Sequence, residues 1–158
     1  MAERIYDHSQ LGWIVMVTLG FTQVIFSIQY IFGLGSSTTT FLGYLCLSAV
    51  TFFIASLFYK LRVLVNESGI HLIYGIGLVK IHLKPDCVKS VRMVKNPWYY
   101  GMGIRIIPRG TLYNIQGIDA VEIIYEDGRR ERMVRIGSDE VHILKAFLDI
   151  KYGLQKCV

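Results

Sequence analysis

Charged residues are missing from about a third of this chain. No Asp, Glu, Lys or Arg occurs between Ser9 and Tyr59, although the whole sequence of 158 residues carries 17 basic and 12 acidic side chains. One charge at the centre of a membrane span costs about 2.5 to 3.5 kcal/mol, so a block without charge can enter a bilayer. An ordinary soluble surface is excluded for this block, and the basic residues belong almost entirely to the part that comes after it.

Cysteine is scarce, and its spacing lacks the patterns of a metal or redox site. No Cys-x-x-Cys pair exists, which leaves zinc ribbons, thioredoxin-like motifs and c-type haem attachment without support. An odd number of scattered thiols suits a reducing compartment better than a disulfide framework. The three residues are Cys46, Cys87 and Cys157.

Recognisable catalytic motifs are also absent. The sequence contains no Gly-x-Ser-x-Gly, no His-Glu-x-x-His and no Walker Gly-x-x-x-x-Gly-Lys-Ser/Thr. Its histidines are dispersed, and a strand pair such as His71 and His82 is more often structural than metal-binding. We therefore expect no enzymatic activity, no cofactor, no metal, no small-molecule substrate and no nucleic-acid partner.

Two long apolar runs fill the charge-free block. They extend from Leu11 to Phe32 and from Phe41 to Tyr59, and about 20 helical residues are needed to cross a hydrocarbon core. A two-helix transmembrane hairpin is predicted over 11–59, after an N-terminal segment of residues 1–10. The alternative, a helical hairpin buried in a soluble core, would need a partner layer that the chain lacks. Gln23 and Gln29 are polar residues of the first run, and we expect helix packing from them rather than transport.

The basic residues around these runs predict an orientation. Lys60 and Arg62 follow the second run directly, and Arg4 is the only base before the first. The positive-inside rule then places both termini in the cytoplasm. The predicted location is the inner (plasma) membrane, as a multi-pass protein. The first ten residues do not resemble a basic signal-peptide region, so we expect them to be retained.

Residues 60–158 change to short apolar runs separated by turn signals, which predicts a small all-β domain. Eight runs have a strand-like pattern, and about seven antiparallel strands are expected. Pro108 and Gly110 fit a type I turn, and Asp127-Gly128 fits a two-residue type I′ hairpin. The strand-like runs are LRVLVN, IHLIYG, LVKIHL, VKSVRMV, GIRIIP, TLYNI, AVEIIYE and RRERMVRI.

The C-terminal part has a helical pattern instead. Ser138 can cap a helix over about 139–152 whose first turn holds Asp139 and Glu140. Its apolar stripe must be buried against the strands. The predicted fold class is a membrane α-helical hairpin plus a small β sandwich or open barrel, closed by one C-terminal capping helix.

The segment NPWYYGMGIRI, residues 96–106, has half of a dinucleotide-binding fingerprint. Its glycines precede a strand rather than open a helix, and a third glycine is missing. A dinucleotide-binding motif needs both features, so we do not expect nucleotide binding here. It is expected to be a loop entering the fifth strand. We expect partial burial, with Trp98 or one of the tyrosines inside the sandwich.

A family resemblance begins in this segment and extends to the start of the C-terminal helix. The run NPWYYGMGIRIIPRGTLYNIQGIDAVEIIYEDGRRERMVRIGSDE resembles the core of bacterial PH-like membrane proteins of uncharacterised function. The resemblance covers about half of the chain closely. It implies two transmembrane helices followed by a cytoplasmic PH-like domain, and it implies little about function, because this fold has many roles.

Two functions remain open. The first is docking: the tethered domain binds a protein partner or forms a homo-oligomer, with Trp98, Tyr99 and Tyr100 as aromatic anchors. The alternative is an anionic-lipid-surface binding or envelope-stress sensing module. In that case the same rings enter the headgroup region beside Arg105 and Arg109.

Overall fold

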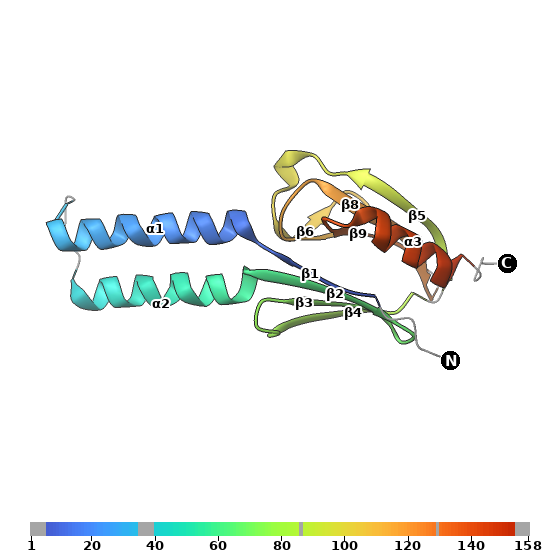
Figure 1. Cartoon of the computed structure of the whole chain (residues 1–158), viewed down its shortest axis with the longest axis horizontal. Helices are drawn as coiled ribbons and strands as arrows, with labels where there is room; N and C mark the ends of the chain where they lie inside the picture. The colour runs from blue at the N-terminus through green and yellow to red at the C-terminus, as the bar shows by residue number, and fades with distance from the viewer. Residues whose placement is uncertain (1–5, 35–39, 86, 129, 154–158) are drawn as a thin grey trace.

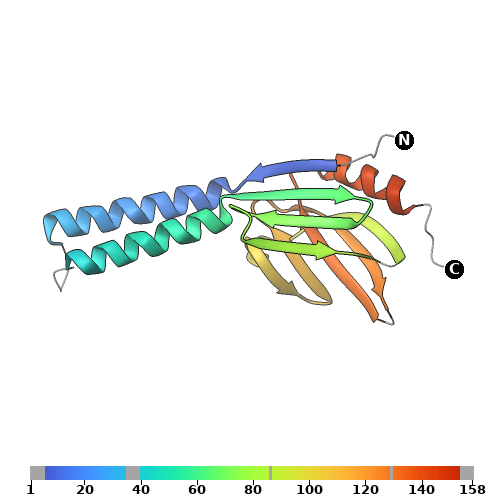
Figure 2. The same ribbon diagram turned by 90° about the horizontal axis from the view of Figure 1, so that it is seen from below.

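The computed structural model describes residues 6–34, 40–85, 87–128 and 130–153 and has two parts (Figure 1). A long antiparallel helix hairpin projects from one end of a β domain, and the C-terminal helix lies along the side of that domain (Figure 2). In chain order the elements are β1 (Tyr6–Leu11), α1 (Trp13–Phe32), α2 (Phe41–Phe58), β2 (Lys60–Asn66), β3 (Gly69–Tyr74), β4 (Val79–Leu83), β5 (Cys87–Lys95), the 3₁₀ turn η1 (Trp98–Tyr100), β6 (Gly103–Ile107), β7 (Gly110–Asn114), β8 (Asp119–Asp127), β9 (Arg130–Gly137) and α3 (Val141–Tyr152).

The two predicted apolar runs form helices close to their expected limits. α1 has 20 residues and α2 has 18, and both are long and apolar enough to cross a membrane. None of their residues is buried within the chain. Apolar helices without any buried residue need an apolar environment, and no other part of the described chain covers them.

Polar side chains join the two helices midway along the hairpin. Gln23 Nε2 on α1 donates a hydrogen bond to Ser48 Oγ on α2 at 2.8 Å. Ser27 Oγ and the Tyr44 hydroxyl lie 3.1 Å apart, and the Tyr30 and Tyr44 rings stack with centroids 4.8 Å apart. Gln23 therefore has the packing role that its sequence position indicates.

A four-stranded antiparallel sheet has the order β1-β2-β3-β4. β1 differs from the prediction, in which residues 1–10 form a separate segment. Tyr6 instead pairs with Val65, and Leu11 pairs with Lys60. Only Tyr6 and Gln10 of this strand are buried, so its sequence lacks the apolar alternation that marks a strand.

A second, five-stranded sheet has the order β5-β8-β9-β7-β6. All eight strand-like runs form strands, one more than the seven expected, and β1 brings the number among the described residues to nine. The pairing of β7 with β9 is parallel, so the expectation of a purely antiparallel domain is wrong at this point. A small β domain behind a helix hairpin is confirmed as the coarse architecture.

Both sheets contribute to one hydrophobic core, which α3 completes. Leu144 and Leu148 of α3 are fully buried in it. The Phe147 ring of α3 lies 5.8 Å from the Tyr6 ring of β1, and α3 also packs on β5 and β8. The helix therefore closes the gap between the β1 edge of one sheet and the β5 edge of the other.

Several local predictions need correction. Arg109 has φ +75°, which is typical of a type II turn after Pro108 and not of the predicted type I. Asp127 pairs with Arg130, so the last hairpin loop begins at Gly128, one residue later than expected. Cys87 is disulfide-bonded, so the expectation of unpaired thiols is wrong for this residue.

The start of α3 also differs from the prediction. Ser138 Oγ accepts a hydrogen bond from the Glu140 N–H at 3.1 Å, and the helix begins only at Val141. Asp139 and Glu140 lie before the helix, and both contact His8 of β1, at 2.7 Å and 3.1 Å. The two carboxylates thus connect α3 to the first strand.

Gln10 provides a test of the unexpected first strand. Its side chain is buried, donates to the Gly137 carbonyl at 3.2 Å and accepts from the Asp139 N–H at 3.0 Å. Gln10→Ala leaves both backbone groups without these partners and should lower the free energy of unfolding by about 1 to 3 kcal/mol. Urea unfolding in detergent micelles measures the change. Ser9→Ala, at a position of the same strand that is not buried, is the control, and equal stabilities for the two variants would contradict the role of β1.

Candidate interaction site

The helix hairpin is inserted between two paired strands of the β domain. Only Gly12 separates β1 from α1, and only Tyr59 separates α2 from β2. The Gly12 N–H donates to the Tyr59 carbonyl at 2.7 Å, which continues the pairing of β1 and β2 up to the first turn of the helices. Because each junction between a strand and a helix is a single residue, this end of the domain, which we call helix-facing, stays beside the helices.

The β3–β4 loop is fixed against the end of α2. The Gly75 N–H donates to the Lys60 carbonyl at 2.7 Å, and the Ile76 N–H donates to the Ser56 carbonyl at 3.1 Å. A Cβ atom on Gly75 would lie only 2.1 Å from the Ser56 carbonyl oxygen. The two hydrogen bonds hold the loop beside the helices, and only a glycine permits this close approach. The apolar side chains of the loop, Ile76 and Leu78, are 62% and 64% exposed.

The segment NPWYYGMG crosses the five-stranded sheet. It connects β5 and β6, which are the two opposite edges of that sheet. Arg135 Nη1 donates to Asn96 Oδ1 at 3.1 Å. Since Val134 and Ile136 face the core, Arg135 holds the start of this segment from the outer side of the sheet. Both views place the crossing at the end of the domain that faces the helices (Figures 1 and 2). A Cβ atom on Gly103 would lie 4.0 Å from the Phe58 ring of α2.

The aromatic residues of this crossing are more exposed than expected. Trp98 is 84% and Tyr99 67% exposed, and only Tyr100 is half-buried. The expectation that Trp98 or one tyrosine enters the sandwich is therefore wrong. A 3₁₀ turn has three residues per turn, so consecutive side chains point in three different directions and only one can face the sheet.

The sequence-predicted site residues do not form one group. Arg105 Nε donates to the Met102 carbonyl at 3.2 Å and a Cβ atom on Gly101 would lie 3.8 Å from its guanidinium, so Arg105 lies beside the aromatic turn. Arg109 lies at the far end of β6, in the turn to β7. The structure thus brings Trp98, Tyr99, Tyr100 and Arg105 together and separates Arg109 from them.

Ile76 and Leu78 lie in the β3–β4 loop, which is also beside the helix ends, and were missed by sequence reasoning. They lie in the run GIGL, where two exposed apolar residues stand in a glycine-rich turn, and that is the signal that could have found them. We refer to Ile76, Leu78, Trp98 and Tyr99 as the helix-facing rim. All four are large side chains more than 60% exposed at one end of the domain.

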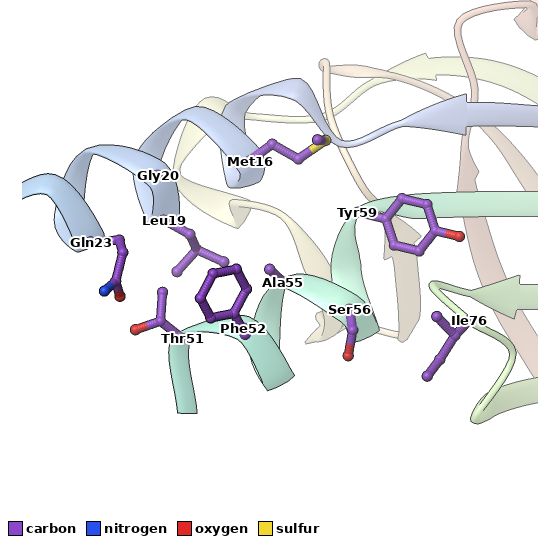
Figure 3. Close-up of a pocket in the computed structure, with 10 residues that line it drawn as sticks. All are labelled: Met16, Leu19, Gly20, Gln23, Thr51, Phe52, Ala55, Ser56, Tyr59 and Ile76. Atoms are coloured by element: carbon purple, nitrogen blue, oxygen red, sulfur yellow. The ribbon is translucent and has the colours of Figure 1, made fainter. Parts of the chain in front are cut away.

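A groove of about 520 Å³ opens between the two helices above the β3–β4 loop (Figure 3). Leu19 and Gly20 of α1 and Thr51 and Phe52 of α2 line its walls, and Ile76 lies at its domain end. A Cβ atom on Gly20 would meet nothing within 4 Å. The groove is therefore an apolar extension of the rim between the helices.

The two strand histidines form a stacked pair on the other sheet. The rings of His71 and His82 are nearly parallel with centroids 4.2 Å apart. His71 Nε2 contacts Ser68 Oγ at 2.9 Å, and His82 Nε2 contacts the Ser68 carbonyl at 3.0 Å. Burial, and then the nearby His82 and Lys151, lowers the pKa of His71. These contacts fit a structural role for the pair.

Comparisons with known proteins add no relative to these observations. No protein-family model matches the chain, and neither the curated proteins nor the solved structures contain a match. The function of the protein is therefore inferred from the geometry of the chain itself.

Gly75 tests whether the loop is fixed against α2. Gly75→Ala would force a methyl group into the Ser56 and Leu57 carbonyls at a residue with φ +54°, and should destabilise the domain by about 3 kcal/mol. Gly117→Ala is the matched control, because Gly117 has φ +78° but open space around it; it should cost about 1 kcal/mol. Thermal unfolding of both proteins measures the difference. Equal losses would show that the close approach is unimportant.

Proposed function

We propose that this protein is a non-enzymatic, membrane-anchored module whose β domain rests on an anionic membrane surface through the helix-facing rim. The observation that carries the proposal is the exposure of Trp98 at the end of the domain next to the helices. Indole and phenol rings favour the membrane interface, where one end of the ring is apolar and the other is wet.

The lengths of the helices support this position. At 1.5 Å per residue, the 20 residues of α1 extend about 30 Å, which equals the thickness of a typical hydrocarbon core. No helical length is left to hold the domain away from the bilayer. The rim, which lies directly beside the helix ends, would therefore be at the level of the lipid headgroups.

Basic residues stand close to the same end of the domain. Lys60 begins β2 next to the end of α2, Lys95 ends β5 just before the aromatic crossing, and Arg105 contacts that crossing. Each base near an anionic leaflet contributes about 1 kcal/mol of attraction. The rim and these bases together match the two signals, apolar and cationic, that give stable surface binding.

Protein docking or homo-oligomer formation through the same rings is the competing function. The position of the rim beside the ends of the two apolar helices supports lipid over a protein partner as its contact. We propose the PH-like fold for the β domain: the strands-then-helix order supports it, whereas nine strands among the described residues and the parallel β7–β9 pair depart from the expected pattern.

The proposed location is the inner (plasma) membrane, with both termini in the cytoplasm. Lys60 and Arg62 at the domain end of the helices support this orientation. The disulfide at Cys87 points the other way, because disulfides persist in oxidising compartments. The orientation is therefore a direct target for experiment.

Brominated lipids test contact between the rim and the bilayer. In a Trp13→Phe background Trp98 is the only tryptophan, and in bilayers containing phosphatidylserine it should emit at shorter wavelength and be quenched by lipids brominated near the headgroup. Arg105→Gln removes one cation and should lower the attraction between the β domain and a phosphatidylserine bilayer by about 1 kcal/mol. The blue shift and the quenching of Trp98 should then depend less on the phosphatidylserine content. The full chain is required, because β1 precedes the helices and a fragment starting at Lys60 lacks it.

A tryptophan at the opposite end of the domain is the matched control. Ile150 is exposed near the C-terminal end of α3, and that end of the helix points away from the hairpin (Figure 1). Ile150→Trp with both native tryptophans replaced by Phe should therefore remain unquenched. Equal quenching at positions 98 and 150, or none at 98, would refute lipid contact at the rim. Crosslinking of Trp98 to a protein instead of lipid would favour docking.

Cysteine labelling tests the orientation. In a background in which Cys46, Cys87 and Cys157 are replaced by Ala, Thr40→Cys marks the far end of the hairpin and Lys80→Cys marks the β domain. A membrane-impermeant maleimide applied to intact spheroplasts should label position 40 and reach position 80 only after permeabilisation. The reverse pattern would place the β domain outside the cytoplasm.

A further inference from the structure

The outer face of the five-stranded sheet carries a second hollow, away from the rim. It has a volume of about 610 Å³, and its lining includes Arg92 of β5, Arg109 of the β6–β7 turn, and Arg132 and Arg135 of β9. Four arginines stand there against two glutamates, which leaves an excess of two positive charges. We call this hollow the arginine groove.

Only some of the charged side chains in the groove form ion pairs within the domain. Arg135 pairs with Glu122 at 2.9 Å, and Arg132 pairs with Asp127 at 3.1 Å. Glu131, the second acid in the groove, is held by Lys89 at 3.0 Å. Both acids of the groove are therefore already neutralised inside the domain.

Arg92 and Arg109 are the two arginines of the groove that have no carboxylate partner among the described residues. Neither takes part in any of the ion pairs found among the described residues, and both side chains are exposed. Arg109 also holds a positive φ, which is uncommon for a residue other than glycine and often marks a site of function.

Apolar side chains lie beside these arginines. Ile124 and Met133 are directly paired across β8 and β9, half-buried on the outer face, and both line the groove with Pro108. Cations around an apolar strip complement a peptide that has acidic and apolar side chains in alternation. A simple inorganic anion would use the charges and leave this strip uncovered.

The position of the groove argues against lipid as its occupant. Arg109 lies at the opposite end of β6 from Gly103, which is next to Phe58. At about 3.3 Å per residue, the strand separates the two by roughly 13 to 20 Å, which exceeds the Debye length of about 10 Å at 0.1 M salt. The groove thus faces the aqueous phase when the rim touches the membrane.

We propose that the arginine groove binds an acidic, partly apolar segment of a partner protein. Arg92 and Arg109 would pair with carboxylates of that segment, and Ile124 and Met133 would contact its apolar side chains. This inference does not depend on lipid binding by the rim. It assigns the two interactions to two separate surfaces of one domain.

A designed peptide tests the groove on the full chain in phosphatidylcholine nanodiscs. The probe is a short fluorescein-labelled peptide of alternating Glu and Leu, compared by anisotropy with the same peptide in which Gln replaces Glu. Arg92→Gln and Arg109→Asn should each weaken binding of the Glu peptide about threefold, as expected for exposed ion pairs, and together about tenfold. Asn is chosen at position 109 because it tolerates positive φ.

Control variants separate this site from other causes. Lys80→Gln removes an exposed cation from the four-stranded sheet and should leave affinity unchanged, as should Trp98→Ala if rim and groove are independent. No binding of the Glu peptide by the wild type would overturn the proposal, as would equal binding of the Gln peptide or unchanged affinity in the double variant. Displacement of the peptide by phosphatidylserine vesicles would reassign the groove to lipid and overturn it as well.

Discussion

The rest of the structure depends on the junction between the two sheet strands β1 and β2 and the two helices, where Gly12 is hydrogen-bonded to Tyr59. This hydrogen bond continues the β1–β2 ladder to the point where both strands become helices. A Cβ atom on Gly12 would lie 2.8 Å from the Phe58 carbonyl oxygen, so the junction is as tight as a backbone allows. Because both helices leave from paired neighbouring strands, the hairpin and the domain are oriented by one sheet.

This junction gives different surroundings to the two ends of the domain. At the helix-facing end, the β3–β4 loop and the aromatic crossing each carry large apolar side chains that are more than 60% exposed. Farther along the outer sheet face, Glu122 and Glu131 are held in ion pairs, whereas Arg92 and Arg109 belong to none of the ion pairs among the described residues. One domain with an apolar end and a charged face suits a protein that meets the bilayer and the aqueous phase at once.

The interior shows how β1 became part of the domain in spite of its polar sequence. Tyr6 enters the shared core, where burial raises the pKa of its hydroxyl. Asp7 pairs with Arg62 on the neighbouring strand, and that guanidinium holds the pKa of the carboxyl below its usual value. His8 and Gln10 reach the segment before α3. Each contact is with a residue more than fifty positions away, so no local sequence pattern predicts the strand.

Periodicity and charge in the sequence by themselves determined the two apolar helices, the eight later strands and the C-terminal helix, because these depend on local alternation, turn residues and the cost of burying charge. Only the tertiary structure decided that β1 pairs with β2 and that β7 and β9 run parallel. It also decided that the aromatic crossing faces outward next to the helices. Register, edge order and the side of a sheet on which a crossing lies depend on contacts between distant segments. For that reason Trp98 could be recognised as unusual in the sequence, while the exposure of Ile76 and Leu78 beside the helix ends and the separation of Arg109 from Arg105 became visible only in the fold.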